Sequence, residues 1–152
     1  MRRVVVTGLG LVTPLGIGVK NNWDGITAGK SGITAIDSFD VSDLPAKIAG
    51  QVPRGSASDS MFDPDLYMSP KEQRRVDDFI LYAMGAAVQA VEDSGWAPDN
   101  ENDRERTGVV IGSGIGGLQT IYEGSTLINE RGPRKVGPFF IPSALINLAS
   151  GY

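Results

Sequence analysis

Hydrophobic residues follow strand-like and helix-like patterns in alternation along the chain, which predicts an α/β fold. The β-branched run Val4–Val6 is ended by Thr7 and Gly8, a pattern typical of a strand buried on both faces of a mostly parallel sheet. A second run of this kind, Thr107–Ile111, leads into a cluster of glycines. We therefore expect both runs to be strands of the buried sheet.

Helical spacing is clearest in two segments of the first hundred residues. Val19–Thr27 places its apolar residues on one face and is followed by Gly29, where a C-terminal glycine usually lies. Ser69 precedes a proline and, three residues on, a glutamate, which together predict the start of a helix. The apolar period then continues to Ser94, so we predict one long amphipathic helix from residue 70 to residue 94.

The remaining segments give weaker indications. Residues 46–52 alternate as a second, less regular strand, and residues 53–68 have the composition of a loop. The acidic stretch 99–103 is predicted to be a solvated turn, because arginine occupies the place where a calcium loop requires glycine. Helices are expected over 118–130 and from Pro142 through Leu148.

Composition narrows the possible chemistry. The 152 residues carry 14 Lys+Arg against 18 Asp+Glu, a formal net charge of -4, which argues against a surface devoted to nucleic acid. The profile is that of one soluble domain without a membrane span. There is no cysteine and no histidine, so the sequence excludes a disulfide, a Cys/His metal site, a thiolate nucleophile and a Ser-His-Asp triad.

The glycine cluster after the second apolar run admits two interpretations. Gly112, Gly114 and Gly117 satisfy the G-x-G-x-x-G spacing of dinucleotide-binding turns. That motif also requires a second strand ending in an acidic residue, whereas Glu130 lies at a helix end before a Gly-Pro-Arg-Lys loop. A tight strand-to-helix turn beside a pocket is therefore favoured, and a dinucleotide-binding module stays as the alternative.

Two further groups of residues have both a structural and a functional interpretation. Lys71, Arg74 and Arg75 share one face near the start of the predicted long helix, and Arg134 with Lys135 forms a second basic pair. By spacing alone these cations are a solvated charged face or a docking patch for an acidic partner. The apolar run 139–141 is a piece of core, the wall of an apolar pocket, or a dimer contact.

Four motifs in this order resemble the elongating β-ketoacyl-[acyl carrier protein] synthases. The resemblance runs in register from Arg2 to Tyr152. The motifs are Arg2-Arg3-Val4-Val5-Val6-Thr7-Gly8-Leu9-Gly10, Lys71-Glu72-Gln73-Arg74-Arg75, Ile111-Gly112-Ser113-Gly114-Ile115-Gly116-Gly117, and Gly132-Pro133-Arg134-Lys135 with Pro138-Phe139-Phe140-Ile141-Pro142.

The resemblance implies a thiolase-like, layered αβαβα fold, of which residues 1–152 are most of the N-terminal half. It implies an acyltransferase that condenses malonyl-[acyl carrier protein] with an acyl thioester held on a cysteine, with loss of carbon dioxide, in fatty acid chain elongation. It also implies a homodimer, no cofactor, and acidic acyl carrier protein as the partner. A polyketide-type condensing enzyme, or its non-catalytic partner, shares much of this pattern.

The family's catalytic cysteine and two histidines have no counterpart here, so we expect a chain cut before that cysteine and inactive alone. The supporting residues carry over. Ile115, Phe140 and Ile141 match the family's acyl-chain pocket. The resemblance favours the docking patch over the solvated charged face, because five basic positions match the family's docking surface for acyl carrier protein: Lys71, Arg74, Arg75, Arg134 and Lys135. No signal peptide is recognisable, so we expect a cytoplasmic location.

Overall fold

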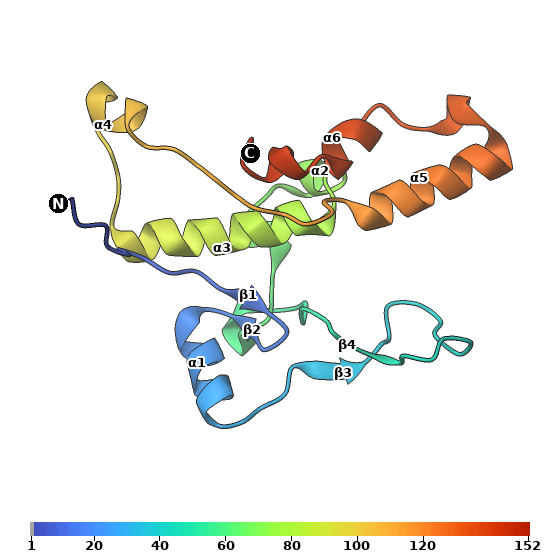
Figure 1. The fold of residues 1–152 in the computed structure, drawn as a ribbon, viewed down its shortest axis with the longest axis horizontal. Helices are drawn as coiled ribbons and strands as arrows, with labels where there is room; N and C mark the ends of the chain where they lie inside the picture. Colours follow the sequence, from blue (N-terminus) through green and yellow to red (C-terminus); the bar gives the residue numbers. More distant parts are fainter. Residues whose placement is uncertain (1) are drawn as a thin grey trace. The chain divides into compact units, whose positions relative to one another are not determined.

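The structure, a computed structural model, describes residues 2–152 and divides into two compact units (Figure 1). The first unit contains residues 2–63 and 85–95, and the second contains residues 64–84 and 96–152. Helix α3 (Asp78–Ser94) contributes to both. The mixture of helices and short strands agrees with the predicted α/β class.

Both strands predicted to be buried are absent, so that part of the sequence analysis is wrong for this structure. Neither Val4–Val6 nor Thr107–Ile111 forms a strand, and Val4 and Val110 are 96% and 97% exposed. A strand forms only where a neighbouring backbone supplies the hydrogen bonds of a ladder. Within residues 2–152 no segment pairs with either run, so the β-branched residues have nothing to pack against.

The strands that do form are two short antiparallel pairs in the first unit. β1 (Val12–Thr13) pairs with β2 (Gly16–Ile17), and β3 (Ile33–Ala35) pairs with β4 (Ile48–Gly50). In the second pair Thr34 is opposite Ala49. β4 lies inside the weak strand predicted over 46–52, whereas its partner β3 was not predicted. Residues 53–68 are mainly loop, as expected, with 3-10 turns at Ala57–Asp59 (η1) and Pro64–Leu66 (η2).

The segment after the valine run lies directly on the second half of α3. Leu9 N donates to Asp93 Oδ2 at 2.9 Å, and Leu11 N donates to the Gln89 side-chain oxygen at 3.5 Å. A Cβ added at Gly8 or Gly10 would lie 2.2 and 2.0 Å from backbone oxygens of α3. The glycines of this motif are therefore required for close approach of two backbones.

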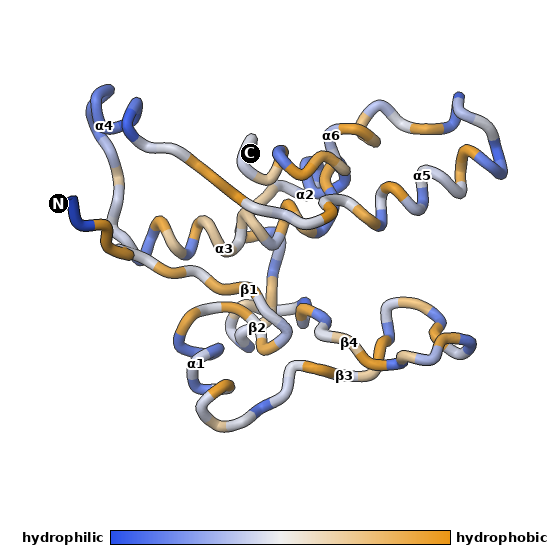
Figure 2. Tube along the Cα trace, viewed as in Figure 1, coloured by the Kyte–Doolittle hydropathy of each residue, from blue (hydrophilic) through white to orange (hydrophobic). Residues whose placement is uncertain are grey.

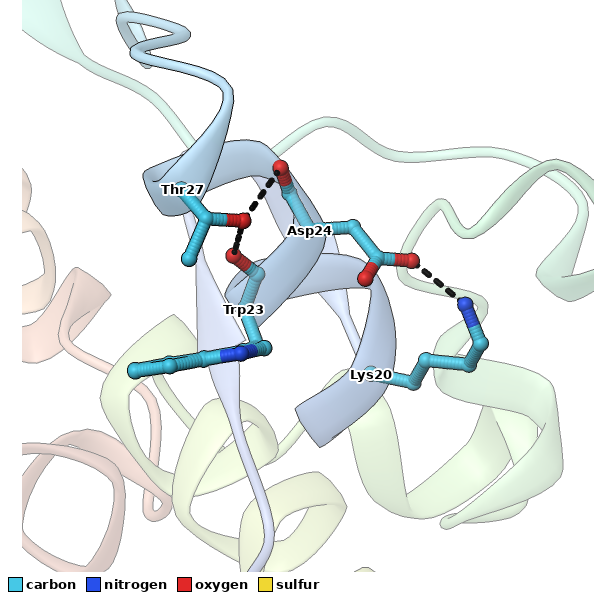
Figure 3. Close-up of polar contacts among 4 residues, drawn as sticks. All are labelled: Lys20, Trp23, Asp24 and Thr27. Atoms are coloured by element: carbon cyan, nitrogen blue, oxygen red, sulfur yellow. Dashed lines mark hydrogen bonds and ion pairs between the residues drawn. The ribbon is translucent and has the colours of Figure 1, made fainter.

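Helix α1 (Val19–Thr27) has the predicted bounds and the predicted end. Gly29 adopts φ 67°, the left-handed conformation typical of a residue just beyond a helix. Figure 3 shows Thr27 Oγ1 donating to the carbonyls of Trp23 and Asp24, while Lys20 forms an ion pair with Asp24. The hydrogen bond that Lys20 donates to the Asp24 carboxylate raises the pKa of Lys20. Both side chains are solvent-exposed, so this ion pair contributes little to stability.

A buried amide fixes the turn that precedes α1. Asn22 is 1% exposed, and its Nδ2 donates to the carbonyl oxygens of Gly16 and Gly18 at 3.1 and 2.8 Å. Its Oδ1 accepts a hydrogen bond from the Thr13 hydroxyl. One side chain therefore satisfies polar groups of β1, β2 and the helix start.

Replacing Asn22 with alanine is expected to lower the free energy of unfolding by about 2 kcal/mol, because buried carbonyl groups lose their donors. Urea or thermal denaturation measures this change. Replacing the exposed Asn129 with alanine is the matched control and should change stability by less than about 0.5 kcal/mol. Equal stability of the two variants would contradict the role assigned to Asn22.

The second unit is helical and differs from the prediction at three places. α2 (Pro70–Gln73) and α3 are separated by a non-helical turn, so the long helix expected over 70–94 is broken. The acidic stretch contains a short helix, α4 (Glu101–Glu105), because Asn100 caps it through Asp103 N at 3.0 Å. The last helix, α6 (Phe140–Ala144), begins before Pro142 and ends earlier than predicted.

The longest helix wholly within this unit is α5 (Leu118–Arg131), close to the predicted 118–130. Figure 2 shows hydrophobic and hydrophilic positions alternating along it, as its spacing predicts. The 3-10 turn η3 (Pro133–Lys135) follows α5, and η4 (Ile146–Ala149) follows α6. The buried apolar side chains of the unit lie before α2, on α3 and in η4: Met68, Ile80, Leu81 and Ala149. No helix in the described part of the chain has the length and hydropathy that crossing a membrane requires.

Candidate functional site

The glycine-rich loop lies against the end of α6, within the second unit. Gly117 N donates to Ala144 O at 3.1 Å, and Gly116 N donates to the Ser113 hydroxyl at 3.2 Å. A Cβ on Gly116 would lie 2.6 Å from Ala144 O, and its φ of 80° is in the left-handed region. Gly116 and Gly117 are therefore fixed in contact with α6 by their lack of side chains.

This contact brings together the two segments that carry the predicted pocket residues. Ile115 precedes the fixed glycines, and Phe140 and Ile141 begin α6. The Phe140 ring covers Gly124 of α5, where an added Cβ would lie 2.3 Å from its Cε2. Ile115 and Ile141 are 63% and 58% exposed, so both are available to contact an apolar ligand or partner.

Three of the predicted basic residues lie at the break between α2 and α3. Lys71 is in α2, Arg74 caps its C-terminus, and Arg75 is in the turn that follows. Arg75 places its guanidinium 4.5 Å from the centre of the Phe139 ring, an arrangement that favours a cation–π interaction. Arg75 lies in the turn that interrupts the single long helix predicted over 70–94.

The other two basic residues lie elsewhere in the same unit. Arg134 and Lys135 belong to η3, which Figure 1 shows beyond the far end of α5, away from α2. The five cations therefore form two separate groups. Among residues 2–152, none of the four exposed members forms an ion pair, so their charge is not neutralised within the chain: Lys71, Arg74, Arg134 and Lys135.

Sequence analysis missed a residue that joins these elements. Asp77, the last residue of the turn, accepts hydrogen bonds from Thr120 N at 3.0 Å and Thr120 Oγ1 at 2.8 Å. The sequence contained one indication of such a residue. The residue before α5 is Gly117, which has no side chain to cap the helix, so a capping group from another segment could have been expected. Proximity of residues 43 positions apart could not be read from the sequence.

The described residues offer no group for covalent or metal chemistry of the kinds excluded above. The chain has no cysteine and no histidine, and residues 2–152 contain no cluster of acidic side chains able to hold a metal ion. Gly117 N, an amide at the helix start where a dinucleotide phosphate would bind, is already bonded to Ala144 O. The geometry gives a dinucleotide no support.

A separate pocket of about 330 Å³ lies in the first unit. Its walls are mainly apolar and include Pro14, Leu15, Ile26 and Ile33. It contains none of the residues that the sequence singled out for binding.

Comparison with known proteins agrees with the resemblance found in the sequence. Residues 1–152 match the family described as "Beta-ketoacyl synthase, N-terminal domain". The chain is 51% identical over 151 residues to the "3-oxoacyl-[acyl-carrier-protein] synthase 2" of Rhizobium meliloti (strain 1021), covering 99% of this chain and 36% of that protein. It spans about a third of the length of the curated relatives that it matches.

Solved structures have the same fold. "The ishigamide ketosynthase/chain length factor" is similar with a TM-score of 0.76 and 25% identity, covering 97% of this chain and 35% of that chain. A second similar structure is described as a type II PKS acyl-carrier protein in complex with its ketosynthase bound to the hexaketide. Its TM-score is 0.69 and its identity 21%, and the match covers 99% of this chain and 37% of that chain.

Proposed function

Because the chain belongs to the β-ketoacyl synthase family, whose N-terminal domain it matches throughout, we propose that it forms the first part of a fatty acid elongating enzyme. The complete enzyme would be an acyltransferase that condenses malonyl-[acyl carrier protein] with an enzyme-bound acyl thioester. In this proposal residues 1–152 are most of the first half of a thiolase-like, layered αβαβα fold. The unpaired runs at Val4–Val6 and Thr107–Ile111 would then join the central sheet.

The observation that carries the proposal is the contact between the glycine-rich loop and α6. The contact joins the segment that carries Ile115 to α6, so one unit carries both the residue that would border its own acyl pocket and the Phe140–Ile141 pair that would reach the pocket of a second copy. A fatty chain has no polar group to recognise, so such a pocket selects by shape and length.

The chemistry itself requires groups that this chain does not carry. In the proposed reaction malonyl loses carbon dioxide, and its carbanion attacks the carbonyl carbon of the acyl thioester. A carbon–carbon bond forms, the bond from carbonyl carbon to cysteine sulfur breaks, and the thiolate leaves. Two histidines stabilise the enolate and the oxyanion. With no cysteine or histidine among them, residues 1–152 serve binding and positioning, and we expect no condensation by this chain alone.

The unneutralised cations fit an acidic carrier protein as the partner. In this proposal the docking surface includes both basic groups, one at α2 and the turn after it and one in η3. Exposed charges at such an interface mainly accelerate association and are weakened by salt.

Reversing one of these charges tests the docking surface. In the full-length protein, Arg74→Glu should raise the KM for carrier-bound substrate about tenfold at low salt, with kcat unchanged. Initial rates at several salt concentrations measure the effect, which should shrink as salt is added. Lys30→Glu, the same charge change at an exposed residue outside the basic groups, is the control. An Arg74→Glu variant that keeps the parental KM at low salt would show that the carrier docks elsewhere.

A polyketide-type condensing enzyme, or its non-catalytic partner, is the second candidate, because one structure with this fold is a type II polyketide ketosynthase. The full-length protein, given malonyl-carrier and a fatty acyl primer, should release one β-ketoacyl product. No product from either fatty or polyketide primers would favour the non-catalytic partner.

The dinucleotide alternative is tested by titration of the protein with NAD(P), which should show no binding.

The proposal also includes a homodimer, in which Phe140 and Ile141 reach the pocket of the second copy. Light scattering of the full-length protein should give twice the mass of one chain. Replacing Ile141 with aspartate should favour the monomer, because a charge in an apolar contact loses its hydration. A cytoplasmic location stays a prediction.

A further inference from the structure

Helix α5 begins without a cap of its own. Its N-cap residue, Gly117, offers no side chain, and its first turn contains no acidic residue. The first amide groups of a helix have no partners within the helix, and they favour a nearby negative charge. Leu118 N donates to Gly116 O at 2.9 Å, which leaves the amides of Gln119 and Thr120 to water or to another part of the chain.

A capping side chain could not be placed at position 117 itself. A Cβ there would lie 2.8 Å from Ala144 Cα and 2.9 Å from Ser143 O, closer than real Cβ contacts. The contact with α6 thus excludes serine, threonine and aspartate from the cap position. Close packing of the loop and local capping are mutually exclusive here.

Asp77 supplies the missing cap from another element. Its Oδ2 accepts from the amide and the hydroxyl of Thr120, at 3.0 and 2.8 Å, and would lie 3.0 Å from a Cβ on Gly117. Asp77 is half-buried, as is Thr120. A charge-assisted bond to a helix amide is shorter and stronger than a bond between neutral groups.

The position of this cap connects it to the proposed pocket. Gly117 is followed by the capped turn of α5 and preceded by Ile115 and Gly116. The end of the loop is thus held on one side by Ala144 O and on the other by the Asp77 carboxylate. Loss of either anchor would let the Ile115 backbone shift.

We propose that Asp77 is a positioning residue that, by capping α5 across the fold, holds Ile115 in place and so sets the longest acyl chain accepted. The inference rests on the function proposed above. Asp77 does not touch the substrate; it acts through Thr120 and the loop.

The test uses the full-length protein with Asp77→Ala, which removes both carboxylate oxygens and leaves Thr120 N without its acceptor. The ratio of kcat/KM for long primers to that for short primers should change about fivefold, because the wall at Ile115 is less fixed. Thr120→Val, which removes only the hydroxyl bond, should change the ratio in the same direction and by less. Glu123→Gln is the control, since it removes a charge from α5 and leaves the cap intact.

Amide hydrogen exchange gives a readout that does not depend on activity. In Asp77→Ala, residues 115–121 should lose protection, whereas Glu123→Gln should leave them protected. A lowered melting temperature with an unchanged primer ratio in both Asp77→Ala and Thr120→Val would reduce Asp77 to a structural role and overturn the proposal. Unchanged protection would also overturn it. Should the parental protein lack condensing activity, the proposed function fails, and the exchange result alone still decides whether Asp77 caps α5.

Discussion

Replacing Ile115 with phenylalanine in the full-length protein is expected to lower kcat/KM for the longest acyl primers about 100-fold and to leave the shortest primers within about twofold. The adjacent glycines are fixed against Ala144 by a 3.1 Å hydrogen bond and by the absence of side chains. The loop therefore cannot retreat to make room for the ring. The additional volume would then be taken from the proposed acyl pocket, which Ile115 is predicted to border.

The same substitution at an isoleucine of α5 distinguishes an effect on the acyl pocket from the effect of adding a ring anywhere on the surface. Ile128 is 40% exposed and lies away from the glycine-rich loop in sequence, so Ile128→Phe should leave the primer profile unchanged. Competition between primers of different length, followed by product analysis, measures both variants. If Ile115→Phe kept the parental length profile, Ile115 would not border the acyl chain.

Gly10→Ala should destabilise the first unit by about 3 kcal/mol, the largest stability effect that we expect from a single methyl group. The added Cβ would lie 2.0 Å from Ala86 O and 2.7 Å from Ala90 N. Both atoms are backbone of α3, so rotation of a side chain cannot relieve the overlap. Either the N-terminal segment leaves the helix or the helix is distorted.

Gly108→Ala provides the comparison, because nothing lies within 4 Å of a Cβ at that position. It should change the free energy of unfolding by less than about 0.5 kcal/mol. Denaturation midpoints of the two variants measure the difference. Similar midpoints would mean that residues 8–11 do not lie on α3 in solution.

Local sequence was sufficient for helices whose start and end depend on nearby residues. Ser69 caps α2 as predicted, with Glu72 N donating to its hydroxyl, and Gly29 follows α1 in the left-handed conformation. These features use hydrogen bonds and backbone angles within four residues, which a sequence pattern contains. The strand predictions were wrong because a strand depends on a partner that is distant in sequence. Val4–Val6 has the composition of a buried strand, but composition supplies no neighbouring backbone.

The features of the candidate site also fall into those identified from sequence motifs and those that required the structure. The pocket and docking positions at Ile115, Phe140 and Arg74 were identified from motifs, and they stay predictions. Contacts between distant segments required the structure, and they include Arg75 on Phe139 and Asp77 on Thr120. Both Arg75 and Asp77 lie in the turn that interrupts the helix predicted as continuous from the apolar period, and neither contact could be read from that period.

The sequence by itself determined the family, helices α1 and α5, and the lack of thiol and imidazole groups in this chain, since each follows from which residues are present and how they are spaced. Only the tertiary structure decided that the glycines are needed for backbone contact, that the cations form two groups, and that Asp77 caps α5. These features depend on which segments meet after folding. The free energy of such a contact depends on both segments, so the pattern of one segment does not predict it.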